Sequence, residues 1–125
     1  MINVIQTPFA PEAIGPYSQA ILAGDTLYIS GQIPYNPETM TLVSDDIQEQ
    51  TQRCLENLKA IVEAAGLTLN QVVKVGIFIT NMDDFPLINE VYGTYFHEHQ
   101  PARSTVEVSR LPRDVKIEIE AIAKC

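Results

Sequence analysis

The chain has 125 residues, of which 46% are hydrophobic and 19% are charged, and its formal net charge is −8. A chain of this length and composition buries a core of its own, so we expect one globular domain over residues 1–125. It has no apolar run of about 18 residues and no basic start followed by an apolar stretch. We therefore expect a cytoplasmic protein with neither a membrane span nor a signal peptide.

The positive charges are unevenly placed along the chain. Residues 1–52 contain no Lys or Arg, whereas five of the eight basic residues lie in residues 103–125. Nucleic-acid binding depends on neutralising phosphates, and the overall acidic charge argues against it. A local positive pocket in an acidic protein suits a small anion such as a carboxylate. The two cysteines, Cys54 and Cys125, make neither a disulfide framework nor a metal-binding spacing.

The first third of the chain predicts three strands. Residues 3–6 form a short edge strand, and Tyr17–Leu22 and Thr26–Ser30 are joined by an Ala-Gly-Asp hairpin loop. The segment that follows Gly31, residues 32–40, is rich in proline and predicts a loop.

Two amphipathic helices follow. Ser44 or Asp45 caps the first, whose apolar stripe runs at helical spacing over residues 47–65 until Gly66 ends it. The second is capped within residues 81–84 and tolerates a proline in its first turn. Its apolar stripe comprises Phe85, Ile88, Val91, Tyr92, Tyr95 and Phe96.

Three more strands are expected in the second half. Residues 72–80 form one, with Val73, Val75, Ile77 and Ile79 on one face, and the last two are 102–108 and 115–123, joined by a Leu-Pro-Arg-Asp turn. Because side chains alternate along a strand, one face of the last pair is apolar. We expect the opposite face to carry Arg103, Thr105, Glu107, Lys116, Glu118 and Glu120.

This order of elements predicts an α+β fold in which both helices cover one face of a sheet. The other face is expected to be mixed in character, which suits an oligomer interface with polar clefts better than a monomer surface. The residues expected there are Tyr28, Gly76, Phe78, Arg103, Thr105 and Glu118.

Four separated motifs resemble a known family in their order and spacing. They are IGPYSQ at 14–19, SGQIP at 30–34, PARS at 101–104 and LPRDVKIEIEA at 111–121. Together they resemble the reactive intermediate deaminase family, also called Rid or YjgF-like, and most closely its imine-hydrolysing RidA branch.

The resemblance implies a fold similar to chorismate mutase of the bacillus type, assembled as a homotrimer with three clefts between subunits. It also implies an activity, the hydrolysis of 2-enamine and 2-imino acids such as 2-aminoacrylate and 2-iminobutanoate to 2-oxo acids and ammonia. No cofactor or metal is expected, and the role would be metabolic damage control.

The resemblance assigns the chemistry to two residues. Arg103 matches the family's substrate-binding arginine, and a guanidinium suits the carboxylate of an imino acid. The alternative is an arginine that pairs with Glu107 or Glu120. Glu118 matches the acid that handles the attacking water, and one carboxylate can take the proton of the water and return it to the leaving amine. A paired surface acid, or Glu120 in its place, is the alternative.

Four further residues are expected to line the substrate pocket. Tyr17 would bring its hydroxyl near the substrate, and Gly31 would let the backbone approach it closely. Asn89 offers an amide from the second helix. Thr105 stands where many members of the RidA branch carry a cysteine, which excludes a cysteine nucleophile at this site and leaves the side-chain preference open. Three of them have a plain structural alternative: Tyr17 as an aromatic that only packs, Gly31 as a turn glycine and Asn89 as an exposed helix residue.

The remaining signals are weaker. His97 and His99 are spaced like metal ligands, but no third ligand is in register, so we expect no metal there. Two other functions stay open: a module that binds 2-oxo acids without turnover, and a ribonuclease or translation inhibitor, a role ascribed to some members of the family.

Overall fold

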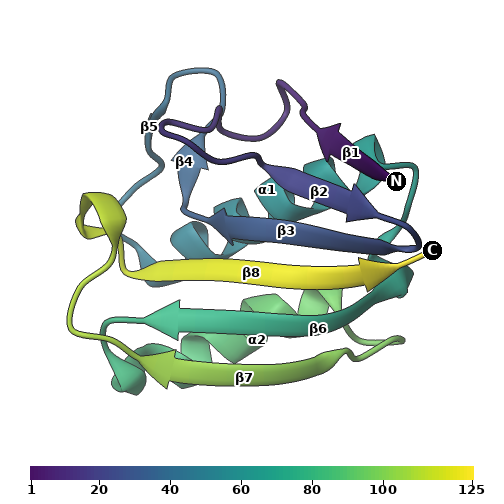
Figure 1. The fold of residues 1–125 in the computed structure, drawn as a ribbon. Helices are drawn as coiled ribbons and strands as arrows, with labels where there is room; N and C mark the ends of the chain where they lie inside the picture. Colours follow the sequence, from purple (N-terminus) through teal and green to yellow (C-terminus); the bar gives the residue numbers. More distant parts are fainter.

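A six-stranded sheet backed by two helices forms the body of the molecule in a computed structural model of residues 1–125 (Figure 1). The strand order is β1-β2-β3-β8-β6-β7; all neighbours are antiparallel except β6 and β7, which are parallel. The strands are β1 (Ile2–Ile5), β2 (Ala20–Ala23), β3 (Thr26–Gln32), β6 (Val72–Ile79), β7 (Ala102–Glu107) and β8 (Ile117–Lys124), with a separate hairpin of β4 (Tyr35–Asn36) and β5 (Thr41–Leu42).

Both helices, α1 (Ile47–Ala64) and α2 (Phe85–Tyr95), lie on the same side of the sheet, behind it in Figure 1. The predicted α+β layout is thus confirmed, although the β4–β5 hairpin within the expected loop was missed. Short 3-10 turns cover Leu69–Gln71, Met82–Asp84 and Pro112–Asp114. Neither helix is long and apolar enough to cross a membrane.

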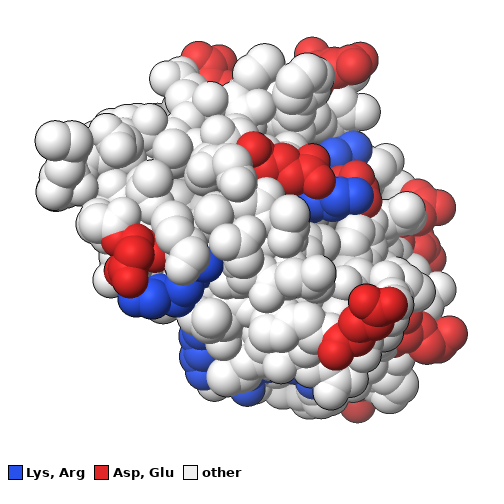
Figure 2. Space-filling model, turned by 90° about the vertical axis from the view of Figure 1, so that its right-hand side faces the viewer, with Lys and Arg blue, Asp and Glu red and all other residues white.

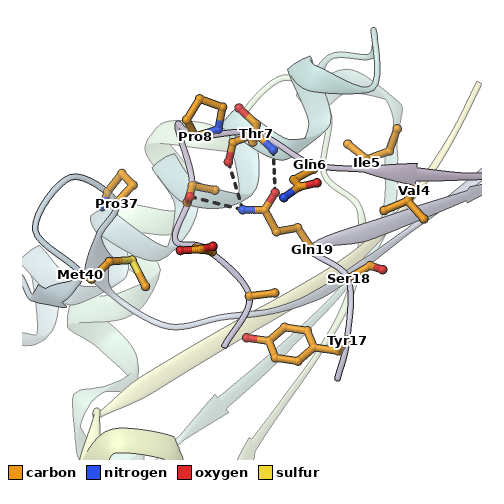
Figure 3. A pocket seen from close by; sticks show the side chains of 13 residues that line it. Val4, Ile5, Gln6, Thr7, Pro8, Tyr17, Ser18, Gln19, Pro37 and Met40 are labelled. Atoms are coloured by element: carbon orange, nitrogen blue, oxygen red, sulfur yellow. Dashed lines mark hydrogen bonds between the residues drawn. The ribbon is translucent and has the colours of Figure 1, made fainter. Parts of the chain in front are cut away.

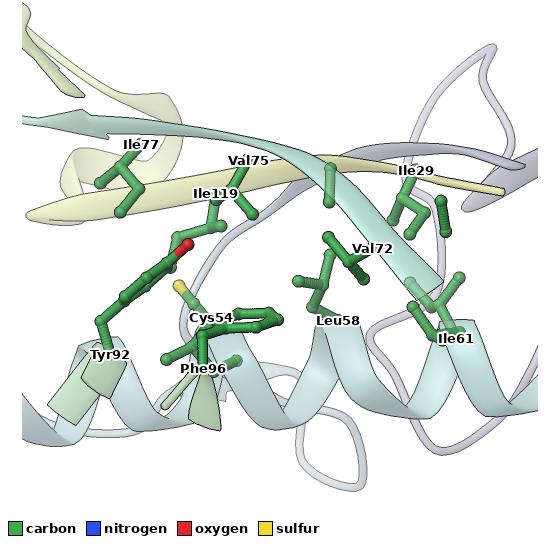
Figure 4. Packing of buried hydrophobic residues seen from close by; sticks show 14 of the residues in the cluster. Ile29, Cys54, Leu58, Ile61, Val72, Val75, Ile77, Tyr92, Phe96 and Ile119 are labelled. Carbon is green, nitrogen blue, oxygen red and sulfur yellow. The ribbon is translucent and has the colours of Figure 1, made fainter. Parts of the chain in front are cut away.

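The core lies between the helices and the central strands (Figure 4). The apolar stripe of α1 packs against one face of β3, β6 and β8, and the predicted stripe of α2 contributes Ile88, Tyr92 and Phe96. The alternation predicted for the last strand is confirmed, since its inward residues are buried. The core members with no exposed surface are Leu27, Cys54, Leu58, Ile61, Val62, Val72, Val75, Ile79, Ile88, Ile117, Ile119 and Ala123.

The face predicted for the strand over residues 72–80 is wrong at its start. Val72 is buried, whereas Val73 is 42% exposed. The register between β6 and β8 shifts between Val72 and Lys74, so a bulge changes the alternation there. From Val75 onward the predicted face is correct.

The faces predicted for β7 are inverted. The two last strands are not neighbours, because β6 lies between them, and β7 is the edge strand of the sheet. Arg103 pairs with Val75 and Thr105 with Ile77, so both point to the helix side of the sheet. The open face therefore contains Tyr28, Gly76, Phe78 and Glu118 as predicted, but neither Arg103 nor Thr105.

The cap of α1 is Asp46 rather than Ser44 or Asp45. Its side chain accepts a hydrogen bond from the backbone N–H of Glu49 at 2.9 Å. We expect Asp46→Ala to lower the free energy of unfolding by about 1 kcal/mol, because an orphan N–H loses its acceptor. Urea denaturation would measure the change. Asp45→Ala, the matched control, should change it by less than about 0.5 kcal/mol, and an equal loss in both variants would contradict the assignment.

Candidate active site

Glu118 lies on the sheet face that the helices leave open. It stands opposite Phe78 of β6, between two fully buried core residues of its own strand, Ile117 and Ile119. Strand alternation thus fixes its direction. The two salt bridges of the chain, Arg110–Asp114 and Lys124–Asp25, leave this carboxylate without a basic partner.

Gly31 lies directly beside this carboxylate. The register between β3 and β8 shifts between Ile29 and Gln32, which places Gly31 in a bulge next to β8. A Cβ atom at Gly31 would overlap the carboxylate of Glu118. A side chain at this position would force the carboxylate of Glu118 to move, so the glycine lets that carboxylate lie where it does.

A cavity of about 480 Å³ brings three predicted residues together, Tyr17, Gly31 and Glu118. Tyr17 comes from the loop before β2, because that strand begins at Ala20 and not at Tyr17 as predicted. The remaining lining residues are Pro11, Glu12, Ile14, Gln19, Ser30, Gln32, Ile33, Tyr35, Met40, Pro112 and Arg113. We call this the Glu118 cavity.

A second cavity of about 630 Å³ adjoins it and shares four residues, Glu12, Tyr17, Gln19 and Met40 (Figure 3). Gln19, which is only 4% exposed, lies in the wall between the two cavities and lines both. Its amide accepts from the N–H of Thr7 at 2.7 Å and donates to three backbone carbonyls of the N-terminal loop, the closest at 2.8 Å. The segment that carries Tyr17 is thereby tied to the N-terminal loop over residues 7–11.

Arg103 belongs to a different group of residues, between β7 and α2. Its Nη1 donates to Oδ1 of Asn89 at 2.8 Å, and its Cζ lies 4.7 Å from the ring centre of Tyr92 and 5.2 Å from that of Phe85. Aromatic faces stabilise a guanidinium without neutralising it. Arg103 forms no salt bridge, so the alternative in which it pairs with Glu107 or Glu120 is wrong.

Two buried hydroxyls beside Arg103 have no hydrogen-bond partner within the chain, those of Tyr92 and Thr105. Thr105 lies two residues along β7 on the same face as Arg103. Buried polar atoms are almost always paired, so orphaned ones point to a partner from outside the chain. We call Asn89, Arg103 and Thr105 the Arg103 group.

The structure therefore places the six predicted site residues in two groups. Tyr17, Gly31 and Glu118 share the Glu118 cavity on the open face, whereas the Arg103 group lies on the helix side of the sheet. One copy of the chain does not bring the two groups together. Each copy nevertheless carries both.

Sequence reasoning missed the residues that shape both groups. Phe85 and Tyr92 were expected as core residues only, yet they flank the guanidinium of Arg103. Met40 and Arg113 line the Glu118 cavity from left-handed backbone positions, with φ of 56° and 60°. No sequence signal marks a non-glycine residue for that conformation.

Burial raises the pKa of Glu118, and the nearby charge of Glu120 raises it further. A carboxyl with a folded-state pKa above its unfolded value binds its proton more tightly in the folded protein. Its contribution to stability is then present at low pH and is lost as the pH rises through the folded-state pKa. The charged form of Glu118 thus opposes folding at neutral pH.

We expect Glu118→Gln to unfold at a higher temperature than the wild type at pH 7, with the difference vanishing near pH 4. Thermal denaturation across this range would measure it. Glu63→Gln on α1 is the control, because Glu63 is exposed and lies outside the cavity. A glutamine variant that is equally or less stable at pH 7 would contradict the cause given for the shift.

The His97–His99 loop has a structural contact instead of a cluster of metal-binding groups. Nε2 of His99 lies 2.6 Å from the carbonyl oxygen of Val72, at the start of β6. No group of three or more His, Cys, Asp or Glu residues is arranged to hold a metal ion.

Charge is scattered on the face of the molecule that Figure 2 shows. In the view of Figure 2, acidic and basic side chains occur in small separate groups, and much of the face is uncharged. A continuous band of Lys and Arg, which phosphate tracking requires, is missing from this face.

The comparisons with known proteins agree on one family. The family described as Endoribonuclease L-PSP matches residues 7–125. A RutC family protein of Pyrococcus horikoshii is 59% identical over 98% of both chains, and the 2-iminobutanoate/2-iminopropanoate deaminase of Dermatophagoides farinae is 50% identical over 96% of this chain and 94% of its own. Among solved structures, Escherichia coli TdcF with bound serine is 50% identical over 98% of both chains, with a TM-score of 0.94.

Fold and candidate site thus define a small α+β protein of the YjgF type, and the structure of the E. coli YjgF gene product matches it with a TM-score of 0.93 at 50% identity over 98% of both chains. The chain belongs to the reactive intermediate deaminase family, the family described as Endoribonuclease L-PSP.

Proposed function

We propose that the protein is a deaminase that hydrolyses reactive 2-enamine and 2-imino acids, such as 2-aminoacrylate and 2-iminobutanoate, to 2-oxo acids and ammonia. The observation that carries the proposal is the unpaired guanidinium of Arg103, held by Asn89 and two aromatic rings in a chain 50% identical to a named imine deaminase. Such a guanidinium is available to the carboxylate that every substrate of this class carries.

Arg103 would hold that carboxylate bidentately, with the hydroxyl of Thr105 beside it as a further donor. Asn89 fixes the guanidinium through the 2.8 Å hydrogen bond to Nη1. The aromatic contacts restrict it further, so little side-chain freedom remains to be lost on binding. These residues bind and orient the substrate and do not transfer protons.

Glu118 would handle the water. The oxygen atom of the water attacks the carbon of the C=N bond, while Glu118 accepts a proton from the water and passes it to the nitrogen, which gives a carbinolamine. Glu118 then transfers the hydroxyl proton of this carbinolamine to its amino nitrogen. The C–N bond breaks as the C=O bond forms, and a 2-oxo acid and ammonia leave. A raised pKa makes this carboxylate a better proton acceptor and keeps the protonated form accessible. Tyr17 and the backbone at Gly31 would complete the pocket.

The two groups would meet between neighbouring copies of the chain, in a homotrimer of the chorismate-mutase-like type. Support comes from the uncovered sheet face, where Tyr28 is 50% and Val106 46% exposed. Such a face is a poor monomer surface and suits an interface. Sedimentation equilibrium tests the assembly. A cytoplasmic location is part of the proposal, supported by two cysteines that form no disulfide, Cys54 and Cys125.

A coupled assay tests the function. A threonine dehydratase generates 2-iminobutanoate, and its decay is timed with and without the protein. Faster decay with ammonia release is expected. No acceleration, together with binding of 2-oxobutanoate, would support the module that binds 2-oxo acids instead. Salt-dependent binding and cleavage of RNA would favour the ribonuclease function that the family description names.

A further inference from the structure

Arg113 lines the Glu118 cavity and is its only Lys or Arg. The two charged residues that share the lining, Glu12 and Glu118, are both acidic. The other eleven lining residues are uncharged. A single guanidinium thus faces a cavity whose uncharged wall has apolar parts that suit a hydrocarbon chain.

The guanidinium of Arg113 has no partner within the chain. The acid next to it, Asp114, is already bound by Arg110, whose Nε and Nη2 donate to the two carboxylate oxygens at 2.6 and 3.2 Å. The other salt bridge of the chain lies at the opposite end of the sheet, between Lys124 and Asp25. The five N–H donors of Arg113 therefore remain available to a ligand.

The backbone conformation of Arg113 also indicates a ligand site. Arg113 has φ 60° and Asp114 has φ 56°, inside the 3-10 turn over Pro112–Asp114. Met40, which also lines the cavity, has φ 56°. These three are the only non-glycine residues with positive φ, and two of them line this one cavity. Such conformations cost energy and collect at ligand sites.

The cavity is also large for a four-carbon imino acid. Its volume of about 480 Å³ falls in the range of roughly 300–1,000 Å³ that holds much larger ligands. Even with a guanidinium from a neighbouring copy, it leaves room for a longer side chain. Ile14, Ile33 and Met40 offer that chain an apolar wall.

Building on the deaminase function proposed above, we propose that Arg113 binds a terminal carboxylate on the side chain of the substrate. The enzyme then accepts 2-imino acids derived from acidic amino acids, in addition to small uncharged ones. Arg113 is a specificity-determining residue, and the reaction that supplies such a substrate is the oxidation of an acidic amino acid at its C–N bond.

Stable product analogues test this without relying on turnover. Calorimetry would compare 2-oxoglutarate with 2-oxopentanoate, which have the same length and differ in the terminal carboxylate. We expect the wild type to bind 2-oxoglutarate about 10-fold more tightly, as a charge-assisted hydrogen bond allows. Arg113→Gln should lose this preference and change binding of 2-oxopentanoate by less than about twofold, because that ligand carries no terminal carboxylate. Arg113→Lys should keep part of the preference, and Lys59→Gln on α1, the matched control, all of it.

Three outcomes would overturn the inference alone, in a protein that still deaminates 2-iminobutanoate. The first is equal binding of both ligands by the wild type, and the second is a preference for 2-oxoglutarate that survives in Arg113→Gln. The third is an equal loss of affinity for both ligands in Arg113→Gln, which would make Arg113 the anchor of the carboxylate that both ligands share. A wild type that neither deaminates nor binds any 2-oxo acid would overturn the deaminase proposal itself, and the inference with it.

Discussion

Arg103→Ala is expected to lower kcat/KM for 2-iminobutanoate by about 100-fold or more, because the bidentate anchor of the substrate carboxylate is lost. In the folded chain this guanidinium is bound by Asn89 and flanked by aromatic rings, with no acid to neutralise it. The coupled dehydratase assay measures the loss. Since the anchor acts in both ground and transition states, KM should rise strongly.

Two variants keep this prediction specific. Arg103→Lys retains the charge but not the planar fork, and we expect an intermediate loss of about 10-fold or more. Lys59→Ala removes a distant positive charge from α1 and should leave kcat/KM unchanged. Turnover of Arg103→Ala within about threefold of the wild type, in a protein with native circular dichroism, would remove Arg103 from the mechanism, since three-fold is far below the cost of an unmade charged pair.

The elements were predictable because each carries its own local signal. The apolar stripes of both helices, the stop at Gly66 and the alternation of β8 depend on spacing within one segment. The small β4–β5 hairpin and the bulge at Val73 were not, because a bulge or a two-residue strand leaves no periodic pattern.

The face of Arg103 was not predictable for a different reason. Alternation along β7 separates Ala102, Ser104 and Val106 from Arg103 and Thr105, but it does not say which set meets the helices. Hydrophobicity favoured the first set. β7 is an edge strand, however, and there Arg103 packs against the helix side with its guanidinium over the rings of Phe85 and Tyr92. The residues of the first set are left exposed.

That inversion changes the expected site from one surface of one chain to two groups on opposite sides of its sheet. Arg103 and Glu118 are then useful to the same substrate only if they come from different copies. The proposed trimer is therefore a requirement of the mechanism. Without an interface, each copy would hold a carboxylate anchor and a water-handling acid that never meet.

Subunit mixing tests this requirement. Arg103→Ala and Glu118→Gln should each be almost inactive alone. In oligomers formed by co-refolding equal amounts of the two, each site draws its two groups at random from the two variants. About one quarter of the sites then receive an intact Arg103 and an intact Glu118, as a closed ring of identical interfaces requires. We expect about one quarter of the wild-type activity to return, measured in the dehydratase assay.

A matched mixture separates this recovery from a general effect of refolding. Arg103→Ala mixed with Arg103→Lys contains no intact arginine at this position, so every site stays damaged and activity should not exceed the average of the two. Native mass spectrometry would establish that mixed oligomers have formed. If mixed oligomers form and the mixture of Arg103→Ala with Glu118→Gln recovers no activity, Arg103 and Glu118 do not act together across an interface. Because the sheet separates the two residues within one chain, they could not act together there either. That result would contradict their joint role in catalysis.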